Sequence, residues 1–277
     1  AISCSRLYKK LGIKAEQMIM LDSKGVIRKD RPDLSAEKQE FATDIDVHDL
    51  DDAIVGADMF LGLSKGDVLT PEMLKKMAPN PIVFALANPT PEIDYNLAMS
   101  TRSDILMATG RSDFPNQVNN VLGFPYIFRG ALDVRATAIN EEMKLAAVYA
   151  IAQLAKEDVP ELVNNAYNKT NLMFGREYII PKPVDPRLIT TVSPAVARAA
   201  MDSGVARLAI SNWDEYAQEL TRRMGLDNKL LNRVSTRAKT NPKRVVFTEA
   251  DHFKILKAAQ VVRNDGVAIP ILLGNKE

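Results

Sequence analysis

The sequence predicts an α/β fold with a Rossmann-like, doubly wound and mostly parallel sheet, followed by the start of a second α/β domain. Three observations support this expectation. Short apolar runs alternate with helical patterns, which is typical of βαβ units and therefore of a parallel sheet. Turn residues and neutral amides follow the apolar runs, at the positions where a parallel sheet presents its ligand. A new apolar run begins near residue 244, after a polar and basic stretch.

A short helix is expected first, because Ile2, Leu7 and Leu11 lie on one helical face and Gly12 is a suitable stop. Residues 17–22 then form an apolar run that predicts a buried strand. A Rossmann-like domain opens with a strand and a glycine-rich turn, whereas this chain begins inside the first helix and contains no GxGxxG pattern. The domain is therefore expected to be truncated, lacking its first strand and that turn.

Helical spacing returns at residues 47–54, and Thr70-Pro71-Glu72 is a good helix start with a capping hydroxyl, an early proline and an early acid. Three further strands are expected at residues 59–64, 81–87 and 105–108. The carboxyl ends of parallel strands meet at one edge of a sheet. The turns after these strands, and the turn after Asp22, are therefore expected along one rim.

The second half begins with a long, nearly apolar helix that Asn140 can cap, and another helix is expected to start at Ser193-Pro194. The stretch 221–244 is basic, polar and poor in aromatic residues, which predicts a linker or an exposed helix. Strands at 244–249 and 268–274 flank a helix through residues 255–262. One such βαβ unit cannot bury both faces of its sheet, so the chain is expected to be cut at both ends.

Size and charge limit the class of protein. The chain has 277 residues, enough for about two domains, and a formal net charge of +1. This charge favours neither nucleic acid nor an anionic membrane as partner, and the basic stretch lacks stacking residues for nucleic acid. No apolar run approaches the roughly 20 residues of a membrane span. A lone Cys4 cannot form an internal disulfide, so the cytoplasm is the expected compartment.

Two loops that carry amide side chains follow neighbouring predicted strands. Asn88-Pro89-Thr90-Pro91-Glu92 comes directly after the strand at 81–87, and Thr109–Asn120 comes after the strand at 105–108. An asparagine side chain offers both donors and an acceptor, so it can bind a carboxylate or a carboxamide without adding charge. Together the two loops predict one small-molecule site.

These segments resemble the large bacterial NADP-dependent malic enzymes. The resemblance is carried by Asp22–Ile27, Ala87–Ile93, Thr109–Asn120 and Phe124–Asp133. Residues 1–215 resemble the dinucleotide-binding domain of that family, residues 216–242 are expected to be a linker, and residues 243–277 resemble the start of its phosphotransacetylase-like region.

The resemblance implies oxidative decarboxylation of malate to pyruvate and CO2, with hydride transfer to NADP+ and a divalent metal ion, Mg²⁺ or Mn²⁺. In the family the metal carboxylates and the catalytic Tyr and Lys lie upstream of the glycine-rich turn. Those motifs are not found here, so no catalytic residue and no metal ligand is assigned, and this chain alone is expected not to turn over malate. A homo-oligomer and regulation by acetyl-CoA are also implied.

The resemblance also assigns contacts at the nicotinamide end of the site. Asn88 corresponds to an asparagine beside the nicotinamide and the substrate, and Asn120 to a contact with the substrate carboxylate, with Asn119 as its neighbour. Each has a structural alternative: Asn88 as an Asn-Pro turn residue, and Asn120 as a helix N-cap. Ser64 ends a strand at the same rim, and it is either a cofactor contact or a turn cap.

At the adenosine end, Asp22 is expected to accept from the ribose hydroxyls, which by itself disfavours a 2′-phosphate. Ser23 and Lys24 follow at once and can offset this by bonding the phosphate. Lys38 matches a lysine that is linked to NADP preference in related enzymes, and its alternative is an ordinary solvated charge. These cofactor-binding residues together favour NADP over NAD.

Other polar residues of the 109–120 loop are expected to be structural. Arg111 and Asp113 are expected to pair and hold the loop, and Asn116 and Gln117 to scaffold it. Two other classes of function stay open. An acyl-CoA-sensing or phosphate acetyltransferase-like regulatory protein would have residues 243–277 as the start of its main domain. A noncatalytic oligomerisation scaffold is supported only by the apolar helix at 140–156.

Overall fold

The structure is a computed structural model that describes residues 1–224, 234, 237–264 and 266–274. The chain forms two compact units, residues 1–211 and residues 212–277. The predicted domain limits, 1–215, 216–242 and 243–277, stay a prediction, and much of the predicted linker (225–233 and 235–236) lies outside the described residues.

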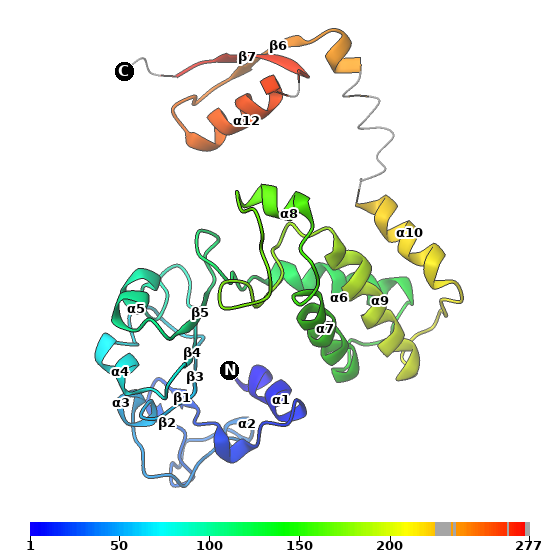
Figure 1. Cartoon of the computed structure of the whole chain (residues 1–277). Coiled ribbons are helices and arrows are strands. Elements are labelled where there is room, and N and C mark those ends of the chain that lie inside the picture. Colours follow the sequence, from blue (N-terminus) through cyan, green and yellow to red (C-terminus); the bar gives the residue numbers. More distant parts are fainter. Residues whose placement is uncertain (225–233, 235–236, 265, 275–277) are drawn as a thin grey trace. The chain divides into compact units, whose positions relative to one another are not determined.

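The first unit is built around a three-stranded parallel sheet (Figure 1). Its strands are β3 (Met59–Gly62), β4 (Ile82–Ala85) and β5 (Leu106–Thr109), in the order β3-β4-β5. Phe60 lies opposite Val83, and Val83 lies opposite Met107. These three side chains are buried in one core. The predicted α/β class with a parallel sheet is therefore confirmed.

Short helices connect these strands. α3 (Leu50–Ala53), α4 (Pro71–Lys76) and α5 (Tyr95–Thr101) lie on one side of the sheet in Figure 1. The Thr70 hydroxyl accepts a hydrogen bond from the Met73 backbone N–H at 3.2 Å, so the predicted start of α4 is confirmed. Because α4 joins β3 to β4 and α5 joins β4 to β5, both connections are crossovers between parallel strands.

The predicted strand at residues 17–22 is wrong. A 3₁₀ turn covers Ala15–Gln17, and β1 (Leu21–Asp22) pairs antiparallel with β2 (Gly25–Val26) in a hairpin. Within the described ranges, β1 is not part of the parallel sheet. The turn after Asp22 therefore does not share the strand-end rim predicted for it.

Local turn chemistry explains this hairpin. The Asp22 carboxylate accepts from the Lys24 backbone N–H at 2.9 Å, and Gly25 has a φ of +104°, which favours glycine. A Cβ on Gly25 would lie 2.5 Å from the His48 carbonyl oxygen, so the close approach of the backbone at His48 also requires glycine. A small separate core covers the hairpin, formed by Met20, Ile27 and Phe41.

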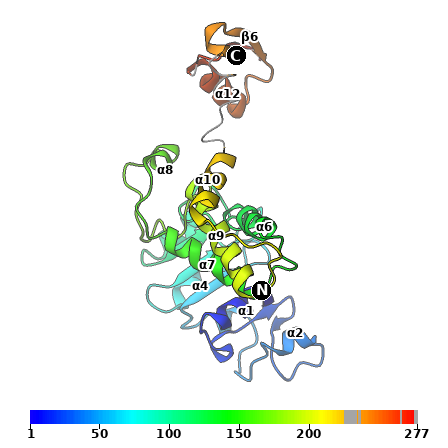
Figure 2. The same cartoon turned by 90° about the vertical axis from the view of Figure 1, so that its right-hand side faces the viewer.

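A second group of helices packs together on the far side of the sheet from α3, α4 and α5, as a bundle of its own (Figures 1 and 2). It contains α6 (Phe124–Asp133), α7 (Glu141–Leu154) and α9 (Arg187–Asp202). The Asn140 side chain caps α7 as predicted, accepting from the Met143 N–H at 3.1 Å. The remaining helices of this unit are α1 (Ile2–Lys10), α2 (Ala36–Gln39) and α8 (Glu161–Ala166).

The predicted start of a helix at Ser193-Pro194 is also wrong, because α9 begins at Arg187 and contains Pro194 in its interior. Asp185 accepts from the Arg187 N–H at 3.0 Å and so supports the first turn. The preceding two turns bury Leu188 and Val192. This burial keeps the helix continuous although a proline removes one backbone hydrogen bond.

The second unit contains α10 (Trp213–Arg223) and a βαβ unit of β6 (Lys243–Phe247), α12 (Phe253–Asn264) and β7 (Ala268–Leu272). β6 and β7 are parallel, as predicted. Val245 and Val246 point to opposite faces of β6 and are 40% and 56% exposed, so neither side chain is fully covered there. Among the helices of the described ranges, none combines the length and hydropathy that a bilayer crossing needs.

Replacing Gly130 with alanine should lower the free energy of unfolding of the first unit by about 1–3 kcal/mol. The added Cβ would lie 2.4 Å from the Ser193 carbonyl oxygen and 2.9 Å from the Val196 Cβ, so α6 and α9 must move apart. This cost exceeds the roughly 0.5–1 kcal/mol that alanine gains over glycine in a helix. Urea unfolding followed by far-UV circular dichroism measures the difference.

Leu132→Ala is the control on the same helix, because Leu132 is 61% exposed. It should stay within about 0.5 kcal/mol of the unmodified chain. A Gly130→Ala chain as stable as the control would contradict the close packing of α6 on α9.

Candidate functional site

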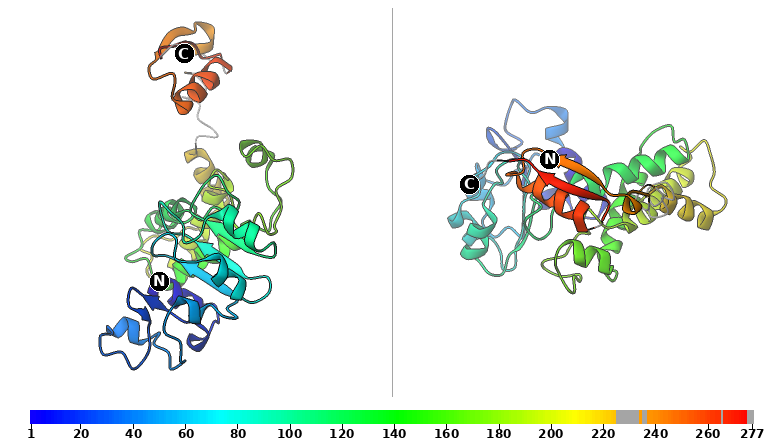
Figure 3. Two further views of the ribbon diagram at one scale, coloured as in Figure 1. Left: turned by 90° about the vertical axis from the view of Figure 1, so that its left-hand side faces the viewer. Right: turned by 90° about the horizontal axis from the view of Figure 1, so that it is seen from above.

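The carboxyl edge of the parallel sheet carries three loops. They span residues 63–70 after β3, 86–94 after β4 and 110–120 after β5. At this edge Gly62, Ala85 and Thr109 lie opposite one another in register, and the left view of Figure 3 shows the strands in cyan and green. Ligand sites of open parallel sheets lie outside this edge. The three loops are therefore the candidate site.

Two predicted asparagines reach this edge from separate loops. Thr109 forms a parallel bridge with Gln117, so the chain returns beside the end of β5. Asn88 lies three residues beyond Ala85, and Asn120 three residues beyond Gln117. Ala85 and Gln117 are two strand intervals apart, about 10 Å. Both asparagines are exposed, and neither side chain bonds to another described residue.

The neighbouring Asn119 has a structural role. Its side chain accepts from the Val121 N–H at 3.1 Å and caps a 3₁₀ turn at Asn120–Leu122. The cap considered for Asn120 is therefore formed by Asn119 instead. As a result, the amide of Asn120 stays available to a ligand.

Glu92 joins the first two loops, and the sequence analysis did not single it out. Its side chain is fully buried. Oε1 accepts from the Ser64 backbone N–H at 3.2 Å, and Oε2 accepts from the Ala87 N–H at 3.0 Å. A Cβ on Gly62 would lie 2.2 Å from the Glu92 carboxyl carbon, so only glycine leaves room for it. Ser64 is held through its backbone and is exposed to solvent.

An aromatic stack joins the start of α5, directly after the second loop, to the third loop. The rings of Tyr95 and Phe114 are stacked, with centroids 4.4 Å apart. The Arg111 guanidinium lies over Phe114 at 5.2 Å and bonds Asp113 at 2.6 Å. The expected pairing of Arg111 with Asp113 is confirmed, and it places the cation on the stack.

Asn116 anchors the third loop. Its side chain is buried, donates to the carbonyl oxygens of Met107 (3.0 Å) and Arg176 (2.6 Å), and accepts from the Ile179 N–H (2.9 Å). Its φ is +55°, a conformation that asparagine tolerates better than most residues. The expected scaffolding role of Asn116 is confirmed, and Gln117 contributes through its backbone bridge.

A second group of predicted residues gathers around the β1–β2 hairpin. Asp22 accepts from Arg31 at 3.0 and 3.1 Å and from the Lys38 ammonium at 2.5 Å. Arg31 and Lys24 also bond Asp33, at 3.1 and 2.6 Å. These five residues, here called the Asp22 cluster, hold three cations against two carboxylates. The bonds from Arg31 and Lys38 hold the pKa of the Asp22 carboxyl well below its usual range.

The sequence analysis found Asp22, Lys24 and Lys38 but missed Arg31 and Asp33. The segment Arg31-Pro32-Asp33 carries no motif, and only the folded hairpin brings it to Asp22. Ser23 and Lys24 are exposed at the tip of the hairpin.

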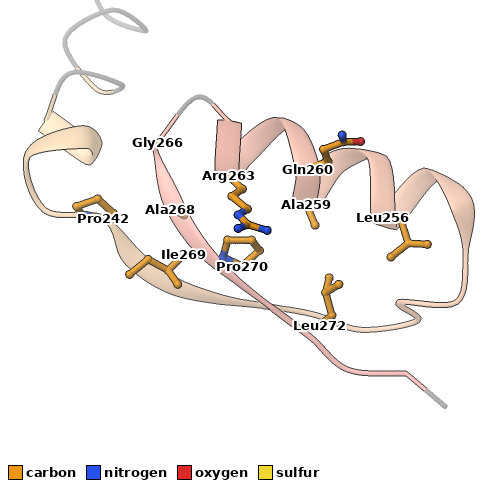
Figure 4. A pocket seen from close by; sticks show the side chains of 10 residues that line it. All are labelled: Pro242, Leu256, Ala259, Gln260, Arg263, Gly266, Ala268, Ile269, Pro270 and Leu272. Atoms are coloured by element: carbon orange, nitrogen blue, oxygen red, sulfur yellow. The ribbon is translucent and has the colours of Figure 1, made fainter. Parts of the chain in front are cut away.

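No group of three or more His, Cys, Asp or Glu side chains is arranged to hold a metal ion in the part of the chain that the structure describes. The second unit has a shallow pocket between α12 and β7 (Figure 4). Its lining is mostly apolar, with Gln260 and Arg263 as the polar side chains. None of the predicted site residues lines it.

Comparison with known proteins adds to this geometry. The family described as "Malic enzyme, NAD binding domain" matches residues 13–169, and "Phosphate acetyl/butaryl transferase" matches residues 229–277. The NADP-dependent malic enzyme of Salmonella typhimurium is 52% identical over 276 residues, which cover 99% of this chain and 36% of that enzyme. An NAD-dependent malic enzyme of Rhizobium meliloti is 47% identical over 279 residues, covering 100% and 36%.

A solved structure agrees with these sequence matches. The malic enzyme of Entamoeba histolytica superposes with a TM-score of 0.72 at 32% identity, over 85% of this chain and 48% of that one. The chain thus spans 36% of the length of the two curated relatives above and 48% of this solved structure.

The Asp22 carboxyl should remain ionised at pH 3, below its reference pKa of about 3.9. Because its folded pKa is lowered, the Asp22 cluster stabilises the fold above about pH 4. This contribution is lost progressively as the pH falls through the folded pKa. Carbonyl ¹³C shifts of labelled aspartate, followed against pH, measure the titration.

Arg31→Met and Lys38→Met together should return the Asp22 pKa toward 3.9, since both cationic donors to its carboxylate are removed and only the Lys24 backbone N–H remains. Lys29→Met is the matched control, because Lys29 pairs with Asp44 outside the Asp22 cluster. If the Asp22 carboxyl of the unmodified chain titrates near its reference pKa of about 3.9, its pairing with Arg31 and Lys38 is contradicted.

Proposed function

Because the chain belongs to the malic enzyme family, we propose that residues 1–215 form the dinucleotide-binding domain of an enzyme that converts malate to pyruvate and CO2. The reaction is an oxidative decarboxylation that reduces NADP+ to NADPH. The domain is a doubly wound, Rossmann-like fold, and the parallel sheet with its helical crossovers supports this assignment.

The observation that carries the proposal is the pair of exposed amides at one sheet edge. Asn88 and Asn120 reach this edge from two loops, and the described residues leave their side chains unbonded. Each amide can donate and accept at once, which suits a carboxamide or a carboxylate. Asn88 contacts the nicotinamide, Asn120 contacts the malate carboxylate, and Asn119 and Ser64 line the same edge.

The Asp22 cluster supports NADP as the cofactor. A free carboxylate at Asp22 would repel a 2′-phosphate, but here Arg31 and Lys38 engage both of its oxygens. The cluster has a net charge of +1, and Ser23 and Lys24 add exposed donors. Overall similarity does not decide this choice, since a relative at 47% identity is NAD-dependent.

Residues 243–277 begin a phosphotransacetylase-like domain, and we assign acetyl-CoA regulation of a homo-oligomeric enzyme to it. The family match over residues 229–277 and the parallel βαβ unit support this part of the proposal. A divalent metal ion, Mg²⁺ or Mn²⁺, belongs to the proposed activity, and no residue of this chain is assigned to it.

Lys38→Ala should weaken NADP+ binding about tenfold more than NAD+ binding. A charge-assisted hydrogen bond to the phosphate contributes about 1.5–3 kcal/mol, and this contact exists only for NADP+. The loss of Lys38 also exposes the Asp22 charge to the phosphate. Isothermal titration of the chain with each dinucleotide measures the two affinities.

Lys29→Ala is the control, because it removes a neighbouring cation that pairs with Asp44. It should leave both affinities within about twofold, because an exposed charge outside the Asp22 cluster is screened by salt. Equal losses for NADP+ and NAD+ in Lys38→Ala would contradict the role of Lys38.

The purified chain should form no NADPH from malate and NADP+, with or without Mg²⁺ or Mn²⁺. The family's metal carboxylates and its catalytic Tyr and Lys are not assigned to any residue of this chain. The absorbance of NADPH gives the rate directly, and a complete NADP-dependent malic enzyme is the positive control. Sustained, malate-dependent NADPH formation would contradict the assignment of roles.

A further inference from the structure

Glu92 is a buried carboxylate whose hydrogen bonds come from peptide groups rather than from a cation. Its two oxygens accept from the backbone N–H groups of Ser64 and Ala87, and no lysine or arginine pairs with it in the described part of the chain. Burying a charge without a cation is costly unless its hydrogen bonds are well made. A loop can be closed by backbone hydrogen bonds alone, without a buried carboxylate.

The backbone around Glu92 completes the link between the two loops. The Glu92 carbonyl oxygen accepts from the Leu69 N–H at 2.9 Å, and the Pro91 oxygen accepts from the Asp67 N–H at 3.1 Å. Gly62 accepts from the Leu86 N–H at 3.2 Å. The loops after β3 and β4 therefore form one hydrogen-bonded body, with Glu92 at its centre.

We propose that Glu92 is a positioning residue of the dinucleotide site. It fixes the Ser64 backbone directly, and it fixes Asn88 through the adjoining Ala87, so the two candidate contacts keep one relative geometry. This inference rests on the proposed function. It separates two properties of the site: Glu92 sets the affinity for any nicotinamide dinucleotide, whereas the Asp22 cluster sets the preference between NADP+ and NAD+.

Glu92→Gln tests this with little change of volume. One carboxylate oxygen becomes an NH2 group that faces a backbone N–H, so one loop loses its anchor. NADP+ and NAD+ affinities should both fall about tenfold or more, by the same factor. Hydrogen exchange at the Ser64 and Ala87 amides should accelerate. Glu72→Gln is the control, because Glu72 is an exposed carboxylate in the first turn of α4. It should change neither the dinucleotide affinities nor the amide exchange rates.

Gly62→Ala is a second, independent variant. Its Cβ would displace the Glu92 carboxyl group, since their carbons would be 2.2 Å apart, so it should reproduce the loss of affinity without removing the charge. In a Glu92→Ala chain the same substitution meets no carboxyl group and should have no further effect. This double-mutant cycle reports the contact itself.

The outcomes distinguish the inference from the proposed function. If the unmodified chain binds neither dinucleotide, the proposed function and this inference are both overturned. If the unmodified chain binds and Glu92→Gln only accelerates amide exchange or lowers stability, Glu92 is a structural brace and the inference alone fails. A change in the ratio of NADP+ to NAD+ affinity in Glu92→Gln would also overturn it.

Discussion

The register of β4 between β3 and β5 is the constraint on which the candidate site depends. Val83 is fully buried, with Phe60 and Met107 opposite it on the two neighbours. Because side chains alternate between the faces of a sheet, a slip by one residue would turn this apolar row out of the core. The same register aligns Gly62, Ala85 and Thr109, and so fixes where each loop leaves the sheet.

Strands of four residues cannot by themselves order the loops that follow them, and the structure orders these loops through side chains. Glu92 joins the first loop to the second, the Tyr95–Phe114 stack joins the start of α5 to the third loop, and Asn116 anchors the third loop to residues 176–179. All three devices use side chains other than the proposed ligand contacts. The exposed amides of Asn88 and Asn120 are thereby left free while their backbones are held.

Local signals in the sequence were sufficient for some elements and not for others. The Thr70 cap of α4 and the βαβ unit at 243–272 follow from residues that are neighbours in the chain. The strand predicted at residues 17–22 was wrong because an apolar run does not show which segment it pairs with. Here the turn at Asp22 and Gly25 determines the pairing and forms a hairpin. The sequence predicted a helix start at Ser193-Pro194 because proline favours the first turn of a helix. The burial of Leu188 and Val192, which extends the helix back to Arg187, does not follow from the local sequence. Glu92 and Arg31 carry no local motif, and their contacts with Ser64 and Asp22 form only in the folded loops.

The two acidic residues at these sites are neutralised in different ways, and this difference has a functional consequence. Asp22 is partly exposed and is matched by cations, so an approaching phosphate meets little of its negative charge. Glu92 is buried and matched by peptide N–H groups, which can hold a carboxylate without placing a mobile cation at the strand ends. In the proposed function, a lysine or arginine paired with Glu92 would compete with Asn120 for the malate carboxylate. Peptide donors avoid that competition, so the proposed cofactor preference at Asp22 and the proposed geometry at the strand ends can be set by separate residues.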